Sequence, residues 1–205
     1  MSTAAYLAAE RAAETKHEYW NGAIYAMTGA SARHNIIVSN VIFSLKLQLR
    51  GRACTVYPSD LRVKVAATGL YTYPDVTVVC GKSVFDDRQQ DTLLNPTLIV
   101  EVLSRTTAAY DRGAKFAHYR TLESLRDYVL ISQDIPLVEH FARQPDDKWL
   151  LGVYDQLESV ITLDGIPATL PLSELYDQLD WPVDDASPLR IMREEADLYS
   201  TVDQP

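Results

Sequence analysis

The sequence predicts a mixed α/β (α+β) fold in which one central β-sheet is flanked by helices. Two short segments, VTVVC (76–80) and LIVEVL (98–103), have the nearly continuous hydrophobic pattern of central strands covered on both faces. A helical pattern at 107–122 follows these strand-like segments, and more of them come after it. The length of 205 residues suits one domain, and 47% hydrophobic and 23% charged residues are typical of a globular protein.

The N-terminal third predicts a helix, a hairpin and a second helix. Ser2 and Thr3 can cap an Ala-rich helix that ends near Glu14. The segment 17–27 predicts a β-hairpin, because Asn-Gly at 21–22 is the preferred pair for a type I′ turn. A long helix is expected from Ser31 to Gly51. Its apolar residues are spread over much of its surface, which predicts a helix packed inside the domain: Ile37, Val41, Phe43, Leu45, Leu47 and Leu49.

Strand-like segments dominate the rest of the chain. A helix is expected at 107–122, and a short one is expected to be capped near Ser173. We expect a single domain over 1–180 and an acidic tail over 181–205 that is loosely docked or disordered. The expected strands are 54–57, 61–65, 75–80, 97–103, 127–132, 137–143 and 149–154, with a turn at 144–147.

Charge is distributed unevenly along the chain. The net charge of −9 argues against a simple nucleic-acid coat protein. Residues 33–64 nevertheless carry six basic side chains and one acid, whereas residues 171–205 carry nine acids and two arginines. The basic segment is expected either to face a phosphate backbone or to form a solvated helix face.

Cysteine usage and hydropathy indicate a cytoplasmic protein. Cys54 and Cys80 lie in apolar, strand-like segments, and we expect two buried, reduced thiols. The longest apolar runs are too short to cross a bilayer, and the N-terminus does not resemble a signal peptide. We therefore expect no membrane partner.

Two acidic residues interrupt the apolar central strands. Asp75 follows Pro74 directly before VTVVC, and Glu101 lies inside LIVEVL. A buried carboxylate is costly unless its charge is compensated, and Mg²⁺ binds to a few carboxylates, waters and substrate phosphates. If the two strands are neighbours, Asp75, Glu101 and the main-chain carbonyl of Val102 would form a metal site. The alternative is a strand-end aspartate and a glutamate satisfied by an arginine or a backbone amide.

A lysine on the following helix can complete such a site. Asp111 and Lys115 are four residues apart and would share one helix face. Lys115 would then orient a water or stabilise the charge of a pentavalent phosphate. The alternative is an ordinary solvated ion pair.

Three further residues are supporting candidates. Asp60 is either another metal ligand or a turn residue that caps a backbone amide. Glu18 in the hairpin either reaches the same cleft or faces solvent. His34 at the start of the long helix is a weaker candidate, because a single histidine usually has a structural role.

Five segments, in this order, resemble the Uma-type endonuclease family, a former family of unknown function: YPDVTVVC, NPTLIVEVLS, YDRGAKF, HYRTLESLRDYVLISQ and VEHFARQ. The resemblance covers roughly residues 5–179. It implies membership of the PD-(D/E)XK nuclease superfamily and a restriction-endonuclease-like mixed sheet flanked by helices. It also implies that Asp75 is the aspartate of the motif and Glu101 its acidic partner.

The sequence departs from the superfamily pattern at one position. The motif lysine should stand two residues after Glu101, where this chain has Leu103. In the superfamily that lysine can move to a neighbouring helix, so the resemblance makes Lys115 the first candidate and Lys64 the second. The family's pattern is also matched by Asp111, Arg112, Tyr119 and Tyr128.

Two functions are consistent with these residues. The first is a Mg²⁺-dependent endonuclease, with Mn²⁺ as a possible substitute, whose DNA substrate is implied by the resemblance. The second is a catalytically weak or inactive module that binds nucleic acid or protein, which Leu103 and the net charge favour. Exposed aromatic residues in the hairpin, and the need of many nucleases to address two strands, suggest a homodimer. The chain has no GxSxG motif and no P-loop, and we expect no organic cofactor.

Overall fold

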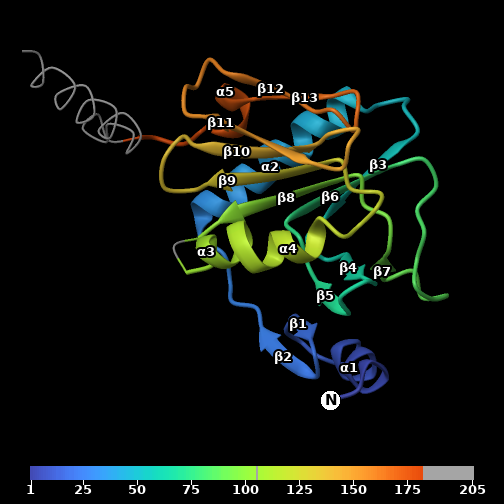
Figure 1. The fold of residues 1–205 in the computed structure, drawn as a ribbon. Helices are drawn as coiled ribbons and strands as arrows, with labels where there is room; N and C mark the ends of the chain where they lie inside the picture. Colours follow the sequence, from blue (N-terminus) through green and yellow to red (C-terminus); the bar gives the residue numbers. More distant parts are fainter. Residues whose placement is uncertain (105, 182–205) are drawn as a thin grey trace, which may run out of the picture.

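The computed structural model describes residues 1–104 and 106–181 (Figure 1). Its largest sheet has six strands in the order β11-β10-β9-β8-β6-β3, and a second sheet has five in the order β2-β1-β5-β4-β7. Strands β12 and β13 form a small third sheet. The strands of the six-stranded sheet are β3 (Cys54–Pro58), β6 (Val76–Cys80), β8 (Leu98–Leu103), β9 (Asp127–Ser132), β10 (Val138–Arg143) and β11 (Trp149–Tyr154).

The six-stranded sheet is mixed. Strands β8 and β9 are parallel, while its other neighbours pair antiparallel. Parallel neighbours need a crossover connection, usually a helix. Here the crossover is one helical segment made of α3 (Ala108–Tyr110), a π-helical turn η1 (Asp111–Lys115) and α4 (Phe116–Tyr119). This segment lies across one face of the sheet in Figure 1.

The two faces of this sheet have separate apolar cores. On one face, α2 (Ala32–Gln48), β12 (Val160–Thr162), β13 (Thr169–Pro171) and α5 (Leu172–Leu175) contribute to a cluster that includes Val100 and Val129. On the other face, Ile99 and Leu103 pack with the crossover segment and β4. Because side chains alternate along a strand, Glu101 points to the same face as Ile99 and Leu103. Alternation therefore turns Glu101 toward the crossover segment.

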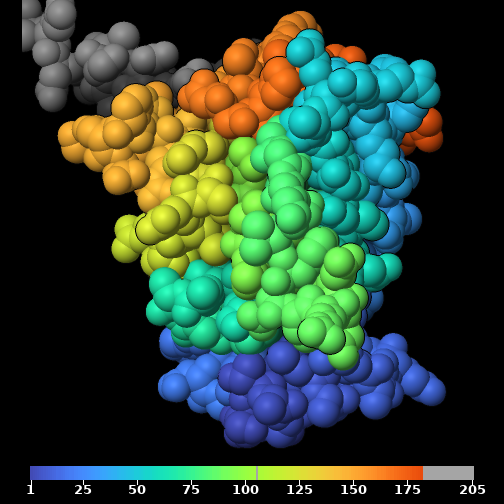
Figure 2. Space-filling view, turned by 90° about the vertical axis from the view of Figure 1, so that its right-hand side faces the viewer, coloured from blue at the N-terminus to red at the C-terminus, as the bar shows by residue number. Residues whose placement is uncertain are grey.

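The N-terminal segment packs against the five-stranded sheet. Helix α1 (Thr3–Glu10) covers a hairpin of β1 (His17–Trp20) and β2 (Ala23–Ala26), whose turn residues have the positive φ angles that a type I′ turn requires. Tyr6, Tyr19 and Tyr71 form a small aromatic core between them. Figure 2 shows this segment, coloured dark blue, at one end of the molecule. The other strands are β4 (Arg62–Val65), β5 (Leu70–Thr72) and β7 (Thr92–Leu93).

The predicted fold class and most elements are confirmed, with differences at several boundaries. Strands β5, β7, β12 and β13 were not predicted, α1 ends at Glu10 rather than near Glu14, and α5 begins at Leu172 without a side-chain cap from Ser173. The prediction that the long helix is packed inside the domain is wrong. Only one of its faces is buried, and Phe43 on another face is 70% exposed.

The prediction of two reduced thiols is also wrong, because Cys54 and Cys80 form a disulfide. They stand directly opposite each other on the antiparallel strands β3 and β6, with their Cα atoms 4.0 Å apart. Sequence alone does not reveal this register. The predicted acidic tail, apart from Trp181, lies outside the described residues. No helix in the described part of the chain is long and apolar enough to span a bilayer.

Candidate active site

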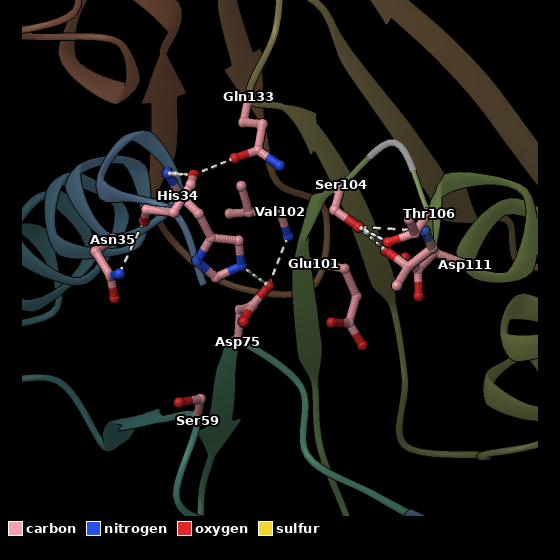
Figure 3. A network of polar contacts seen from close by, with 12 residues as sticks. His34, Asn35, Ser59, Asp75, Glu101, Val102, Ser104, Thr106, Asp111 and Gln133 are labelled. Carbon is pink, nitrogen blue, oxygen red and sulfur yellow. Dashed lines mark hydrogen bonds and ion pairs between the residues drawn. The ribbon is translucent and has the colours of Figure 1, made fainter. Parts of the chain in front are cut away.

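Asp75 and Glu101 meet where two central strands pair. Strands β6 and β8 are antiparallel, with Val76 opposite Val100, and continuing this register by one residue places Asp75 opposite Glu101. Residues that stand directly opposite in an antiparallel pair have their side chains on the same face. Figure 3 shows the two side chains next to each other, as the sequence predicted for neighbouring strands.

Two donors hold Asp75 in place. The main-chain N–H of Val102 donates to Oδ2 of Asp75 over 2.8 Å, and Nε2 of His34 lies 3.1 Å from the same oxygen (Figure 3). An ionised Asp75 accepts this hydrogen bond from the tautomer of His34 that carries its proton on Nε2. The first turn of α2, which Ser31 caps by accepting a hydrogen bond from the N–H of His34, therefore positions the histidine.

Glu101 is buried and has two partners on the crossover segment. Its Oε1 accepts a hydrogen bond from the hydroxyl of Tyr119 over 2.9 Å and lies 2.9 Å from Nζ of Lys115. Glu101 and Lys115 are only 5% and 6% exposed. Asp111 is 3% exposed as well, so the solvated Asp111–Lys115 pair considered from the sequence is not what the structure contains.

The π-helical turn brings Asp111 and Lys115 into this cluster. Oδ1 of Asp111 lies 3.4 Å from Nζ of Lys115, so the two share a helix face as predicted. The hydroxyl of Tyr128 donates to the main-chain carbonyl of Asp111, at the start of the turn. Single π-helical turns occur frequently at functional sites.

The N-terminal hairpin contributes the fourth carboxylate. Oε1 of Glu18 lies 3.3 Å from Nζ of Lys115 and accepts a hydrogen bond from the hydroxyl of Thr72 on β5. Glu18 therefore belongs to the cluster. This was one of the two alternatives considered from the sequence, the other being that it faces solvent. Thr72 was missed, because a three-residue strand has too little periodicity to be found in a sequence.

The cluster has more negative than positive charge. Lys115 is surrounded by Glu18, Glu101 and Asp111, and Asp75 stands beside Glu101. Burial raises the pKa of Glu101 to about 8 against the opposing effect of Lys115, and the charges of Asp111 and Asp75 raise it too. Burial alone would lower the pKa of Lys115, but Glu101 and its other charged neighbours hold it well above its ordinary value. The site thus favours an additional positive charge, either a proton or a cation.

The donor set fits a divalent cation. All described contacts of Asp75 use Oδ2 and those of Glu101 use Oε1, so each carboxylate has a second oxygen. The N–H and C=O of one strand residue point to the same side, so the carbonyl of Val102 faces the edge where its N–H meets Asp75. No group of three or more His, Cys, Asp or Glu suited to a metal occurs among the described residues. Two carboxylates and a carbonyl are nevertheless enough for Mg²⁺, which keeps several waters.

Two predicted candidates lie apart from the cluster. Asp60 is 87% exposed at its side chain and pairs with Lys16 over 3.0 Å. Lys64, the second candidate for the motif lysine, pairs with Asp86 over 2.8 Å. The basic residues of segment 33–64 do not form one surface. Arg62 is buried, while Arg33 donates to the carbonyls of Gln133 and Asp180.

A family model described as "Putative restriction endonuclease" (Uma2) matches residues 3–173. A crystal structure of "a putative nuclease belonging to DUF820" from Anabaena variabilis ATCC 29413 has a similar fold, with a TM-score of 0.66 and 18% sequence identity. The similarity covers 80% of this chain and 91% of that one. The chain therefore has the fold of that nuclease.

Two relatives come from Synechocystis sp. (strain ATCC 27184 / PCC 6803 / Kazusa). One uncharacterized protein is 39% identical over 151 residues, which cover 74% of this chain and 85% of the relative. A second uncharacterized protein is 37% identical over 176 residues, which cover 86% and 91% of the two chains. Together with the family match, these similarities show that the chain belongs to the Uma2 family.

Proposed function

We propose that this chain is a metal-dependent endonuclease that hydrolyses DNA phosphodiesters at a site of the PD-(D/E)XK type. One observation carries the proposal: Glu18, Glu101 and Asp111 surround a single buried lysine, and a fourth carboxylate, Asp75, stands beside Glu101 where β6 and β8 pair. A fold can host many functions, so the fold alone is a weaker argument than the site. A purely structural network would balance its buried charges, whereas this cluster has more carboxylates than cations.

Asp75, Glu101 and the carbonyl of Val102 are the proposed ligands of Mg²⁺, with Mn²⁺ as a substitute. When bound, such an ion polarises the phosphate and lowers the pKa of a water. The chain prepares the ligands in advance, since Val102 and His34 orient Asp75 and Tyr119 orients Glu101. Preset ligands reduce the reorganisation needed during the reaction.

Lys115 is the proposed counterpart of the motif lysine. Its Nζ lies 2.9 Å from Oε1 of Glu101, within hydrogen-bonding distance. Lys115 reaches this position from a helix rather than from β8. The raised pKa keeps it charged at neutral pH. In this position it would orient the attacking water or stabilise the negative charge that develops on the phosphate.

The alternative is a catalytically weak or inactive module that binds nucleic acid or protein. It is favoured by the position of Lys115, which has three carboxylate partners and is almost fully buried. A lysine held in this way has to exchange partners before it contacts a substrate. This reading predicts weak binding of divalent ions and no turnover.

A cleavage assay distinguishes the two. Supercoiled, linear and single-stranded DNA would be incubated with Mg²⁺ or Mn²⁺ and the wild-type protein, Asp75→Ala or Asp60→Ala. We expect cleavage by the wild type and by Asp60→Ala, because Asp60 lies outside the cluster, and none by Asp75→Ala. Cleavage that persists in Asp75→Ala would refute the proposed site. The absence of cleavage by all three proteins, together with only weak Mn²⁺ binding in calorimetry, would favour the binding module.

A further inference from the structure

The face of the hairpin that carries Glu18 also carries exposed aromatic side chains. Trp20 is two residues from Glu18 on the same strand, so both side chains point to one face. Tyr25 stands directly opposite Glu18 on β2 and shares that face. The other face, with Tyr19, packs against α1. One face of the hairpin is thus structural, and the other borders the carboxylate cluster.

Two contacts hold the second face against the crossover segment. Glu18 pairs with Lys115, and the ring of Trp20 meets His118 edge-on with 5.1 Å between centroids. Burial lowers the pKa of His118 below its ordinary 6.5, against the effect of Glu18. The histidine ring is therefore uncharged at neutral pH and serves Trp20 as an aromatic neighbour.

These aromatic rings are largely exposed although they border a polar site. Trp20 is 42% exposed, Tyr25 is 53% exposed and Tyr110 on α3 is 38% exposed. The ring of Tyr110 lies 5.9 Å from Nζ of Lys115, so it borders the cluster from the side of the crossover segment. We call Trp20, Tyr25 and Tyr110 the aromatic ledge. The three rings therefore leave aromatic surface open to solvent next to the carboxylate cluster.

Three cations close in sequence to the ledge are paired within the described part of the chain. Lys115 contacts three carboxylates, Lys16 pairs with Asp60, and Arg112 pairs with Glu139 over 2.6 Å. Binding along a duplex depends mainly on lysines and arginines that neutralise phosphates. Aromatic rings instead bind unpaired bases by stacking on their flat faces, which are hidden within a duplex. The ledge therefore suits bases rather than phosphates.

We propose that the aromatic ledge binds unpaired bases and that the substrate class is DNA with single-stranded segments. The inference rests on the proposed nuclease function, whose cluster of carboxylates lies next to the ledge. Bases stacked on Trp20 and Tyr25 would leave the backbone of the same strand near Glu101. Stacking is tolerant of sequence, so the ledge confers a preference for strand state rather than for a base.

Equilibrium binding tests this inference in Ca²⁺, in place of Mg²⁺ or Mn²⁺. A labelled oligothymidylate, a duplex of the same length and an oligouridylate would be titrated with the wild type, Trp20→Ala, Trp20→Phe and Phe43→Ala. Phe43 is a matched control, because it is an exposed aromatic residue nine positions beyond His34 on α2, about 14 Å along the helix. We expect the wild type to prefer the oligothymidylate. Trp20→Ala should weaken its binding about 5- to 100-fold, with near-normal binding by the other two variants.

Several results would overturn the inference. These are tighter binding of the duplex, tighter binding of the oligouridylate, an equal loss in Phe43→Ala, or unchanged binding in Trp20→Ala. A Trp20→Ala change that alters the sedimentation coefficient but not DNA binding would assign the ledge to a second copy of the chain. Cleavage that is insensitive to Trp20 would refute the ledge and leave the nuclease function intact. Trp20-dependent binding without cleavage in Mg²⁺ or Mn²⁺ would support the ledge and refute the nuclease function.

Discussion

Two clusters of buried charged residues in the described part of the chain are built differently. In the N-terminal region, the guanidinium of Arg62 donates to the hydroxyl of Tyr73 and to Thr92 and pairs with Asp91. Glu10 accepts hydrogen bonds from that tyrosine hydroxyl and from a main-chain N–H. Arg11 adds a second positive charge next to Asp91. In the candidate site, by contrast, one lysine pairs with three carboxylates, and a fourth, Asp75, stands beside Glu101.

This difference in charge balance distinguishes a structural network from the candidate site. Buried ions are tolerated when partners balance their charge, as Asp91 does for Arg62. The Lys115 cluster has more carboxylates than cations, and burial, together with the charges of Asp111 and Asp75, raises the pKa of Glu101. Perturbed pKa values of this kind are a mark of functional sites, although structural networks produce them as well. Equivalent substitutions in the two clusters therefore provide a direct test.

The largest expected effect comes from removing one buried carboxylate in each cluster. Glu101→Gln should reduce metal-dependent cleavage by about 1000-fold or more, since a proposed ligand of the metal is lost. Glu10→Gln, the matched change in the Arg62 cluster, should leave cleavage per folded molecule within about threefold of the wild type, the range that small structural adjustments explain. The rates would be compared by single-turnover cleavage. A similar loss in both variants would mean that the clusters do not differ in function.

Removing the cation of the structural cluster should mainly affect stability. Arg62→Met removes the buried donor to the hydroxyls of Tyr73 and Thr92 and the partner of Asp91, so the free energy of unfolding should fall by about 1.5–3 kcal/mol. Lys64→Met, two residues along the same strand, breaks a partly exposed pair with Asp86 and should cost at most about 1 kcal/mol. Urea denaturation measures both variants. Equal losses in the free energy of unfolding would show that the buried network contributes no more to stability than the partly exposed pair.

Removing the cation of the candidate site should have a different outcome. Lys115→Met should slow cleavage by about 100-fold, because an electrostatic contribution to the transition state is lost. The same change leaves the carboxylates without their lysine, so Mn²⁺ should raise the melting temperature of this variant more than that of the wild type. Thermal unfolding with and without Mn²⁺ would show this. A smaller shift in the variant would indicate that the lysine does not compete with the metal.

The sequence predicts the centre of the site better than its surroundings. Asp75 and Glu101 were recognisable because an acid inside an apolar strand is rare and costly. Lys115 followed from its spacing to Asp111 and from the family resemblance. These signals are local, so they are visible without the fold.

The remaining features depend on contacts between distant segments. The Arg62 cluster joins α1, β4 and the segment before β7, and no local pattern marks its members. The Cys54–Cys80 disulfide depends on the register of two strands, and the exposure of Phe43 depends on which face of α2 meets the sheet. Asp60 illustrates the converse, since a plausible sequence position was placed on the surface by the turn after β3.

The pH dependence of stability should have opposite signs in the two clusters. The folded-state pKa of Glu101 is raised to about 8 from 4.5, so the folded state binds more protons than the unfolded state between these values. Without metal, the free energy of unfolding should therefore increase as the pH falls from 8 to 5. Urea denaturation in EDTA should show this increase for the wild type but a smaller one for Glu101→Gln. The same increase in both would assign the pH effect to another group.

The smallest effect is expected at the edge of the Arg62 cluster. Hydrogen bonds from Arg11 lower the pKa of Asp91 to about 2 from 3.8, despite partial burial. This stabilisation is present above pH 4 and is lost as the pH falls toward 2, because the unfolded state then binds the proton first. About a third of each side chain is exposed, so solvent screening limits the contribution to about 1 kcal/mol or less. Arg11→Ala should lower stability by this amount at pH 6 and hardly at all at pH 2, measured by urea denaturation. A penalty of equal size at both pH values would show that Arg11 acts through packing rather than charge, and the balance of charge would then no longer distinguish the structural cluster from the candidate site.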